Sequence, residues 1–301
     1  MSPSELPAEV DTLVFIHGWL LSRVYWQPLV QMLSASYHCL SYDMRGFGES
    51  VLATQPVAQS IEATLDPIDL PPGRTLLTPH SGEKIETYQA SAYSLAAYAK
   101  DLENLLDQLG LDQVWLLGHS LGGSVALWAA YLLPERVKGV VCINAGGGIY
   151  IEDEFEKFRT AGQQMLRYRP SWLAQMPLLP RVFSRLMVKQ SLPLHWGKQR
   201  IRDFLRANTQ AAKGALLEST TAEEVYLLPQ VISQLDQPVH FITAAEDTIM
   251  PPRYVQYLAS FHPGFAQGET VSEISDCGHM AMIEQPGHVA QIVESVLSAS
   301  V

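Results

Sequence analysis

Short apolar runs alternate with amphipathic stretches along most of this chain. The runs have the length of strands and are apolar throughout, which is typical of buried parallel strands. They lie at 13–16, 38–42, 114–117, 137–143, 238–243 and 269–274. Apolar residues at helical spacing predict helices at 26–33, 94–109, 121–133, 253–261 and 286–298. Strands that alternate with helices predict an α/β fold with a mostly parallel sheet and helices on both faces.

Two segments interrupt this alternation. Residues 51–92 contain five prolines and keep no period, so they are expected to form a long irregular insertion. It could narrow the entrance to a binding site, or it could be a surface excursion without core contacts. Residues 149–230 show no strand pattern and predict an inserted all-helical subdomain. The expected organisation is therefore a core of residues 1–148 and 231–301 around a helical insertion.

The helical insertion is rich in large apolar side chains. Most are expected to pack against one another, and a minority to line a pocket. They are Phe155, Phe158, Met165, Tyr168, Trp172, Met176, Phe183, Met187, Trp196, Phe204 and Tyr226. At the end of the segment, Thr221 and Glu224 have the spacing of a capping box.

Composition narrows the classes of partner. The chain has 301 residues, 47% hydrophobic and 17% charged, with a net charge of −11. This balance argues against nucleic acid or an anionic membrane as partner, because both bind basic surfaces. Three cysteines without metal-type spacing favour reduced thiols and a cytoplasmic location. No signal peptide is visible near the first residue. Residues 114–134 are apolar enough to resemble a membrane span, but their glycine-rich centre favours a buried strand, turn and helix.

The clearest chemical motif is Gly118-His-Ser-Leu-Gly122, which fits G-x-S-x-G between a predicted strand and a predicted helix. This motif places a serine on a sharp strand-to-helix turn. Glycines on either side of the serine relieve crowding, and the helix N-terminus favours a developing negative charge. Ser120 is therefore the candidate nucleophile.

Two other predicted turns at the carboxyl ends of strands carry suitable partners. Asp247 follows the strand at 238–243, and His279 follows the strand at 269–274. A histidine can accept the serine proton, and a carboxylate on its other ring nitrogen fixes the tautomer. Ligands bind at this edge of such sheets, so Ser120, Asp247 and His279 are expected to meet there. Glu246 is the alternative acid.

These motifs together resemble the α/β-hydrolase superfamily, in the branch with a helical cap. The resemblance rests on five motifs spread over 11–148 and 231–298: His17-Gly18, Asp43-Met-Arg-Gly-Phe-Gly48, Gly118-His-Ser-Leu-Gly-Gly123, Glu246-Asp247 with Pro251, and Gly278-His279 with Glu284-Gln-Pro286. It implies that Ser120 is the nucleophile, Asp247 the acid and His279 the base. It further implies that the backbone N–H groups of Trp19 and Leu121 form an oxyanion hole.

Other polar residues near these motifs are expected to be structural. His17 should brace its loop, and His119 should pack beside the serine. Asp43 and Arg45 should bind each other or nearby backbone. Cys277 should be a small packing residue and Asp276 a turn former.

The leading hypothesis is a serine hydrolase that cleaves an ester of a hydrophobic or aromatic small molecule through an acyl-enzyme. A carbon–carbon bond hydrolase or a non-haem haloperoxidase-like enzyme would use the same three residues. A receptor or pseudoenzyme that keeps the pocket is a further alternative. No Walker pattern, metal cluster or dinucleotide fingerprint is found, so no cofactor or metal is expected. Trp19 and the 51–92 insertion depart from the common family pattern and leave the identity of the substrate open. The oligomeric state is also open.

Overall fold

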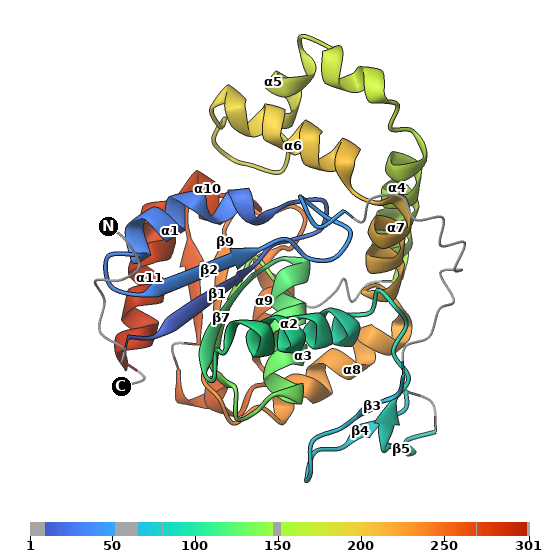
Figure 1. The fold of residues 1–301 in the computed structure, drawn as a ribbon, viewed down its shortest axis with the longest axis vertical. Coiled ribbons are helices and arrows are strands. Elements are labelled where there is room, and N and C mark those ends of the chain that lie inside the picture. Colours follow the sequence, from blue (N-terminus) through green and yellow to red (C-terminus); the bar gives the residue numbers. More distant parts are fainter. Residues whose placement is uncertain (1–9, 52–65, 80, 147–151, 269, 300–301) are drawn as a thin grey trace.

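The computed structural model describes residues 10–51, 66–79, 81–146, 152–268 and 270–299. Its centre is a six-stranded, fully parallel sheet with the strand order β10-β9-β8-β7-β1-β2 (Figure 1). The strands are β1 (Thr12–Ile16), β2 (His38–Tyr42), β7 (Val114–His119), β8 (Val137–Ile143), β9 (Val239–Ala244) and β10 (Val271–Ile274). The predicted parallel sheet is confirmed.

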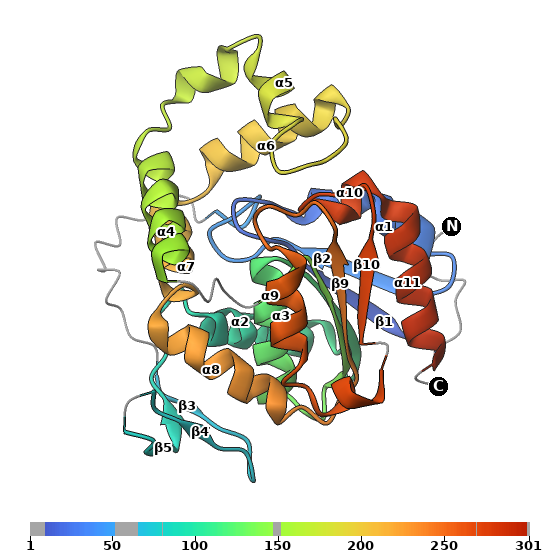
Figure 2. The same cartoon turned by 180° about the vertical axis from the view of Figure 1, so that it is seen from behind.

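Helices cover both faces of the sheet (Figures 1 and 2). One face carries α1 (Gln27–Leu33), α10 (Ala281–Glu284) and α11 (Pro286–Ala299), with the 3-10 helix η2 (Arg23–Trp26). The other carries α2 (Leu95–Leu109), α3 (Leu121–Leu132), α8 (Ala222–Ser233) and α9 (Pro252–Ala259). A further 3-10 helix, η4 (Pro263–Gln267), precedes β10.

Alternating side chains of each strand serve the two faces, because successive strand residues point in opposite directions. Leu13 and Phe15 of β1 join the core beneath α1 and α11, whereas Val14 and Ile16 join the core beneath α2 and α3. Both cores exclude water from these strands, which explains why the runs are apolar throughout.

Local sequence signals set the ends of several helices. The Ser94 side chain accepts from the Ala97 N–H at the start of α2, and Gly110 ends the helix at φ 62°. Thr221 caps α8 by accepting from the Glu224 N–H. The Glu224 carboxylate accepts from Trp128 Nε1 on α3 at 2.5 Å. The predicted capping box is therefore half formed.

The described part of the 51–92 insertion is ordered and packed, which corrects the expectation of an irregular segment without core contacts. Two short antiparallel pairs form, β3 (Ile68–Asp69) with β6 (Thr87–Tyr88) and β4 (Leu76–Leu77) with β5 (Lys84–Ile85). Leu76 and Ile68 are buried in the α2–α3 core. Residues 52–65 and 80 lie outside the described residues.

Gln230 of α8 and Gln234, the residue that follows α8, hold β4 in place. Gln230 and Gln234 each accept from one backbone N–H and donate to one carbonyl, on Leu77 and Thr75 respectively. The side-chain amides thereby satisfy backbone groups that a neighbouring strand would otherwise pair.

The connection from β8 to β9 is helical in its described part, as expected. It contains α4 (Glu152–Arg167), the 3-10 helix η3 (Ser171–Gln175), α5 (Leu179–Phe183), α6 (Leu194–Arg206), α7 (Thr209–Glu218) and α8. We call α4–α7, with η3, the helical segment. In Figures 1 and 2 it lies at the end of the molecule opposite β3–β5, while α8 packs against α3. The domain division at residues 148 and 230 stays a prediction.

The parallel sheet reverses its winding between β1 and β7. Loops from both strands therefore open at one carboxyl edge, where α/β sheets bind ligands. None of the helices in the described residues combines the length and apolar character needed to cross a bilayer.

Candidate active site

Ser120 stands on a strained turn between β7 and α3. Its φ of 51° and ψ of −121° lie outside the regions that residues other than glycine usually adopt. The turn is compact, since a Cβ at Gly118 would lie 2.3 Å from the Gly122 carbonyl oxygen. A Cβ at Gly122 would lie 2.2 Å from the Ile16 carbonyl oxygen. Glycine is thus required on both sides of the serine, and the predicted strand, turn and helix are confirmed.

Asp247 and His279 form a buried pair. His279 Nδ1–H donates to Asp247 Oδ2 at 2.8 Å, which leaves Nε2 as the unprotonated nitrogen in the neutral ring. The other carboxylate oxygen accepts the backbone N–H groups of Ile249 and Met250, each at 2.8 Å. Burial raises the pKa of Asp247, but His279 and these N–H groups together hold it below its usual value. Asp247 is therefore ionised at neutral pH.

Glu246, the alternative acid, points elsewhere. It accepts from the Cys277 N–H at 3.1 Å, and it lies 3.9 Å from the ammonium of Lys189. The structure brings Asp247 to His279, as the sequence predicts, and uses Glu246 to brace the loop that carries the histidine.

Asn144 is a functional candidate that sequence analysis missed. It follows β8 directly, is fully buried, and has a φ of 50°. Its side-chain amide donates to Asp247 Oδ2 at 2.9 Å, beside the hydrogen bond from His279. A polar residue directly after a buried strand was the available signal. Asn144 thus orients the carboxylate on the side away from Ile249 and Met250.

Neither Ser120 Oγ nor His279 Nε2 takes part in any hydrogen bond among the described residues. Both atoms are thus available to a substrate or to each other. Catalytic hydrogen bonds often tighten only when substrate binds, so this arrangement is compatible with a serine–histidine pair.

The other two histidines near the site are structural. His17 donates from Nδ1 to the Gly18 carbonyl and accepts the Met44 N–H at Nε2, which joins the loops after β1 and β2. His119 donates from Nε2 to the carbonyl of His279 at 2.7 Å. Burial lowers the pKa of His17 to about 4 and that of His119 to about 3, so both are neutral. The predicted bracing roles are confirmed.

Two backbone N–H groups close to Ser120 are free. Those of Trp19 and Leu121 enter no hydrogen bond among the described residues, and Leu121 is the first residue of α3. These are the two groups expected to form an oxyanion hole. The Trp19 indole donates to the Ala212 carbonyl of α7 at 2.8 Å, so the bulky ring is anchored to the helical segment.

Ser120 opens into a small, mainly apolar pocket of about 80 Å³. Its apolar wall comes from both the sheet side and the helical segment, and its polar groups are three hydroxyl side chains. The apolar wall includes Trp19, Leu121, Phe158, Leu216, Ile249 and Met250, and the hydroxyls are those of Ser124, Ser219 and Thr220. No described residue of 66–92 lines this pocket.

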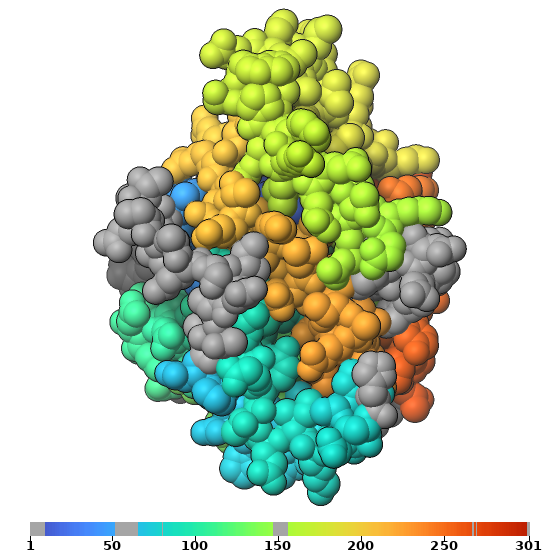
Figure 3. Space-filling model, turned by 90° about the vertical axis from the view of Figure 1, so that its right-hand side faces the viewer, coloured from blue at the N-terminus to red at the C-terminus, as the bar shows by residue number. Residues whose placement is uncertain are grey.

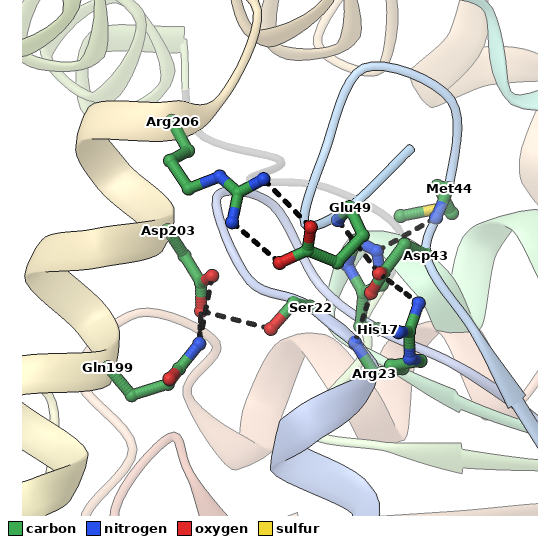
Figure 4. Close-up of polar contacts among 9 residues, drawn as sticks. All are labelled: His17, Ser22, Arg23, Asp43, Met44, Glu49, Gln199, Asp203 and Arg206. Carbon is green, nitrogen blue, oxygen red and sulfur yellow. Dashed lines mark hydrogen bonds and ion pairs between the residues drawn. The ribbon is translucent and has the colours of Figure 1, made fainter. Parts of the chain in front are cut away.

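The helical segment is tied to the loops that carry the site. Ser22 Oγ–H donates to Asp203 of α6 at 3.0 Å, and Arg206 forms a two-pronged ion pair with Glu49 (Figure 4). Burial raises the pKa of Asp203 to about 6, against the opposing hydrogen bonds from Gln199 and Ser22. These contacts fasten α6 to the loops after β1 and β2.

Asp43 and Arg45 do not bind each other, but both bind backbone groups, which is the second of the two alternatives expected from the sequence. Asp43 accepts from the backbone and guanidinium of Arg23 and from the Glu49 N–H (Figure 4). Arg45 pairs with Asp101 and donates to the Ala92 carbonyl. Asp43 thus closes its own turn, and Arg45 secures the start of α2.

A second tie joins the helical segment to the histidine loop. The His279 N–H donates to the Met187 carbonyl at 2.8 Å. The Glu284 carboxylate accepts the N–H of Gly278 at 2.6 Å and that of Lys189 at 2.9 Å. One carboxylate therefore holds the histidine loop and residues 187–189 together.

Comparison with known proteins identifies the family. A family profile described as alpha/beta hydrolase fold matches residues 11–286. The chain belongs to the alpha/beta-hydrolase family. Among the described residues, no group of three or more His, Cys, Asp or Glu side chains is arranged to hold a metal ion.

Relatives of this alpha/beta hydrolase are distant. An uncharacterised protein of Mycobacterium tuberculosis is 28% identical over 69% of this chain and 62% of that protein. The chain thus spans less than two thirds of that relative. An uncharacterised hydrolase of Bacillus subtilis, YugF, is 23% identical over 94% of this chain and 90% of that protein.

Solved structures show the same fold. An esterase from Thermogutta terrifontis has a TM-score of 0.67 at 21% identity, covering 96% of this chain and 90% of the other. A bromoperoxidase from Bacillus anthracis has a TM-score of 0.69 at 18% identity, covering 96% and 92%. At these identities the likeness concerns the fold.

Proposed function

We propose that this alpha/beta hydrolase is a serine esterase that cleaves a carboxylic ester of a hydrophobic or aromatic small molecule. The observation that carries the proposal is the strained Ser120 turn at an apolar pocket, with the buried His279–Asp247 pair on a neighbouring loop. The helical segment, which supplies Phe158 and Leu216 to that pocket, acts as a cap over it.

In the proposed reaction, Ser120 Oγ attacks the ester carbonyl carbon while His279 Nε2 takes the hydroxyl proton. The carbonyl oxygen becomes negative and accepts hydrogen bonds from the N–H groups of Trp19 and Leu121. His279 then gives its proton to the departing alcohol oxygen as the carbon–oxygen bond breaks. A water molecule, deprotonated by His279, releases the acid from Ser120. Asp247 stabilises the imidazolium throughout.

The pocket supports a hydrophobic acyl or alcohol group. Its walls are mainly apolar, and binding sites of this kind recognise ligands through a few fixed polar groups. A cytoplasmic location stays a prediction, supported by the free thiols of Cys39, Cys142 and Cys277.

Turnover of an ester panel of graded chain length tests the proposal. Ser120→Ala and His279→Ala should each lower kcat/KM by about 10⁴-fold or more while thermal unfolding stays near that of the wild type. A fluorophosphonate should label Ser120 and leave Ser124, its neighbour in the pocket, unmodified. An intact chain that turns over no ester would contradict the proposal and favour carbon–carbon hydrolysis, haloperoxidase-like chemistry or a receptor.

The acid has its own matched test. Asp247→Asn keeps the shape but favours the wrong histidine tautomer, and should lower kcat by roughly 10²–10⁴-fold. Glu246→Gln changes the adjacent carboxylate and should keep kcat within about 10-fold, because it braces the loop through one backbone contact. The reverse ranking would make Glu246 the acid.

A further inference from the structure

Charge is unevenly distributed along this acidic chain. Residues 165–206 hold nine of the 20 Lys and Arg residues but one of the 31 Asp and Glu residues. That single acid, Asp203, is buried. We call residues 165–206 the outer cap. Its surface is strongly cationic, although the chain as a whole carries a net charge of −11. The overall negative charge therefore does not exclude an anionic membrane as a partner of this surface.

The outer cap also exposes large apolar side chains. It holds eight of the 13 large hydrophobic residues that are exposed in the described part of the chain. Tyr168, Trp172, Leu178 and Val182 are exposed by 68%, 57%, 63% and 52%. Of the bulky residues singled out for the helical insertion, five are exposed and do not pack internally: Met165, Tyr168, Trp172, Met176 and Tyr226. An exposed apolar cluster of this kind marks an interaction surface.

The apolar and cationic side chains share one surface. A shallow depression of about 730 Å³ between η3, α5 and α6 is lined by Met176 and Leu194 together with Lys198, Arg202 and Arg206. Figures 1 and 3 show this lobe projecting at one end of the molecule. No ion pair among the described residues involves Arg181, Arg185 or Lys198. These charges are available to an external anion.

We propose that the outer cap docks on an anionic lipid bilayer. Interfacial segments combine protruding aromatic and aliphatic side chains with Lys and Arg, so that the apolar groups enter the headgroup region while the cations contact lipid phosphates. The outer cap itself contributes no exposed carboxylate, and Glu49 and Glu246, which reach it from the core, each pair with one of its cations. The proposal concerns binding and is independent of whether the chain hydrolyses esters.

The same charges argue against the simplest alternative occupant. In a symmetric dimer, the outer cap would face a second copy of itself, and two cationic surfaces would be brought together. A bilayer with acidic headgroups instead offers opposite charge over the whole lobe.

Vesicle flotation tests the proposal. The full chain carries Ser120→Ala in this test, so that it cannot hydrolyse lipid and change the composition of the vesicles. It is mixed either with vesicles of phosphatidylcholine alone or with vesicles that also contain about one third phosphatidylglycerol. We expect partitioning onto the anionic vesicles only, weakened in about 0.5 M salt because charges are then screened. A variant with Arg181→Glu, Arg185→Glu and Lys198→Glu should lower the partition coefficient by about 100-fold.

Further variants separate the apolar contribution. The double variant with Trp172→Ser and Leu178→Ser should lower the partition coefficient by about 10-fold or more. Binding to vesicles should shift the tryptophan fluorescence of the chain to the blue, and Trp172→Phe should remove this shift. Lys84→Glu with Leu109→Ser changes an exposed cation and an exposed leucine away from the outer cap and should leave binding unchanged.

Several outcomes would overturn the proposal. One is failure to bind anionic vesicles, and another is equal binding to neutral ones. A third is equal loss in the control variant. The chain could fail to bind vesicles but form dimers that the Trp172 and Leu178 changes abolish. That result would assign the surface to self-association. Capture of an acidic protein without vesicle binding would assign it to that partner.

Discussion

Two long connections leave the carboxyl edge of the sheet, one after β2 and one after β8, and they differ in how much of their apolar surface the core covers. The described part of the first, residues 66–92, buries Ile68 and Leu76, and two glutamines at the end of α8 satisfy backbone groups of β4 and the residue before it. The outer cap of the second anchors Leu192 and Trp196 in the core beneath α1 and α11 and is tied to the loops by polar contacts, yet eight of its large apolar side chains are exposed. Irregular sequence became a core element in the first case, and regular helices became an accessible surface in the second.

The difference has a simple physical cause. A short strand pair needs one apolar residue in a core and hydrogen-bond partners for its backbone. The proline-rich segment supplies the apolar residue, and Gln230 and Gln234 supply the partners. A helix satisfies its own backbone, so its outer face is free to present side chains to another surface. We therefore expect stability to depend on the first connection and activity or docking to depend on the second.

The largest contrast should come from matched leucines. Leu76→Ala removes a fully buried side chain of the first connection and should lower the free energy of unfolding by about 3 kcal/mol. Leu178→Ala changes a leucine of the outer cap that is 63% exposed and should alter it by less than about 0.5 kcal/mol. Chemical denaturation measures both. Equal effects would show that the two connections are anchored alike.

A pH-dependent contrast centres on Glu224, where the first connection meets α8. Burial raises the pKa of this carboxyl to about 8, with help from Glu223 and Glu218 and against the hydrogen bond from Trp128. The Tyr88 ring of β6 stacks on that tryptophan. The folded chain binds a proton that the unfolded chain has released, so stability falls as pH rises from about 4.5 to about 8.

Glu224→Gln keeps an acceptor for Trp128 without the charge. It should therefore stabilise the chain by roughly 1–3 kcal/mol near pH 9 and by almost nothing near pH 4. Thermal melts across this range measure the difference. A variant that is equally destabilised at both pH values would show that Glu224 is ionised and paired in the folded chain.

The smallest expected effect comes from a change that should lower activity without lowering stability. Glu284→Ala frees the N–H groups of Gly278 and Lys189 and loosens the histidine loop from the helical segment. It should lower kcat by roughly 10-fold, because misplaced catalytic groups lose rate steeply. Glu284→Gln keeps one acceptor oxygen, enough for the N–H of Gly278 but not also for that of Lys189, and should recover part of the loss.

The matched control is Gln230→Ala, which frees backbone groups of Leu77 in the first connection. It should lower the melting temperature while kcat stays near the wild-type value. If Glu284→Ala lowered the melting temperature alone, the carboxylate would be a stability element without a role in positioning His279.

The sequence by itself determined the parallel sheet, the Ser120 turn and the ends of α2, because each depends on neighbours in the chain. Gly118 and Gly122 must be glycine for one local turn, and Ser94 and Gly110 cap one helix. The chain order of Ser120, Asp247 and His279 was readable for the same reason, since each follows a recognisable strand.

Only the tertiary structure decided which distant groups meet. Asn144 contacts Asp247 across 103 residues, and Glu284 contacts Lys189 across 95. Neither contact leaves a periodic or local trace in the sequence. The 51–92 insertion was misjudged because some of its backbone groups have partners far along the chain, the side chains of Gln230 and Gln234. The exposure of Trp172 and Leu178 was hidden for a related reason. Hydrophobicity measures the tendency of a side chain to be buried, and only the packed fold shows whether a protein surface is there to bury it.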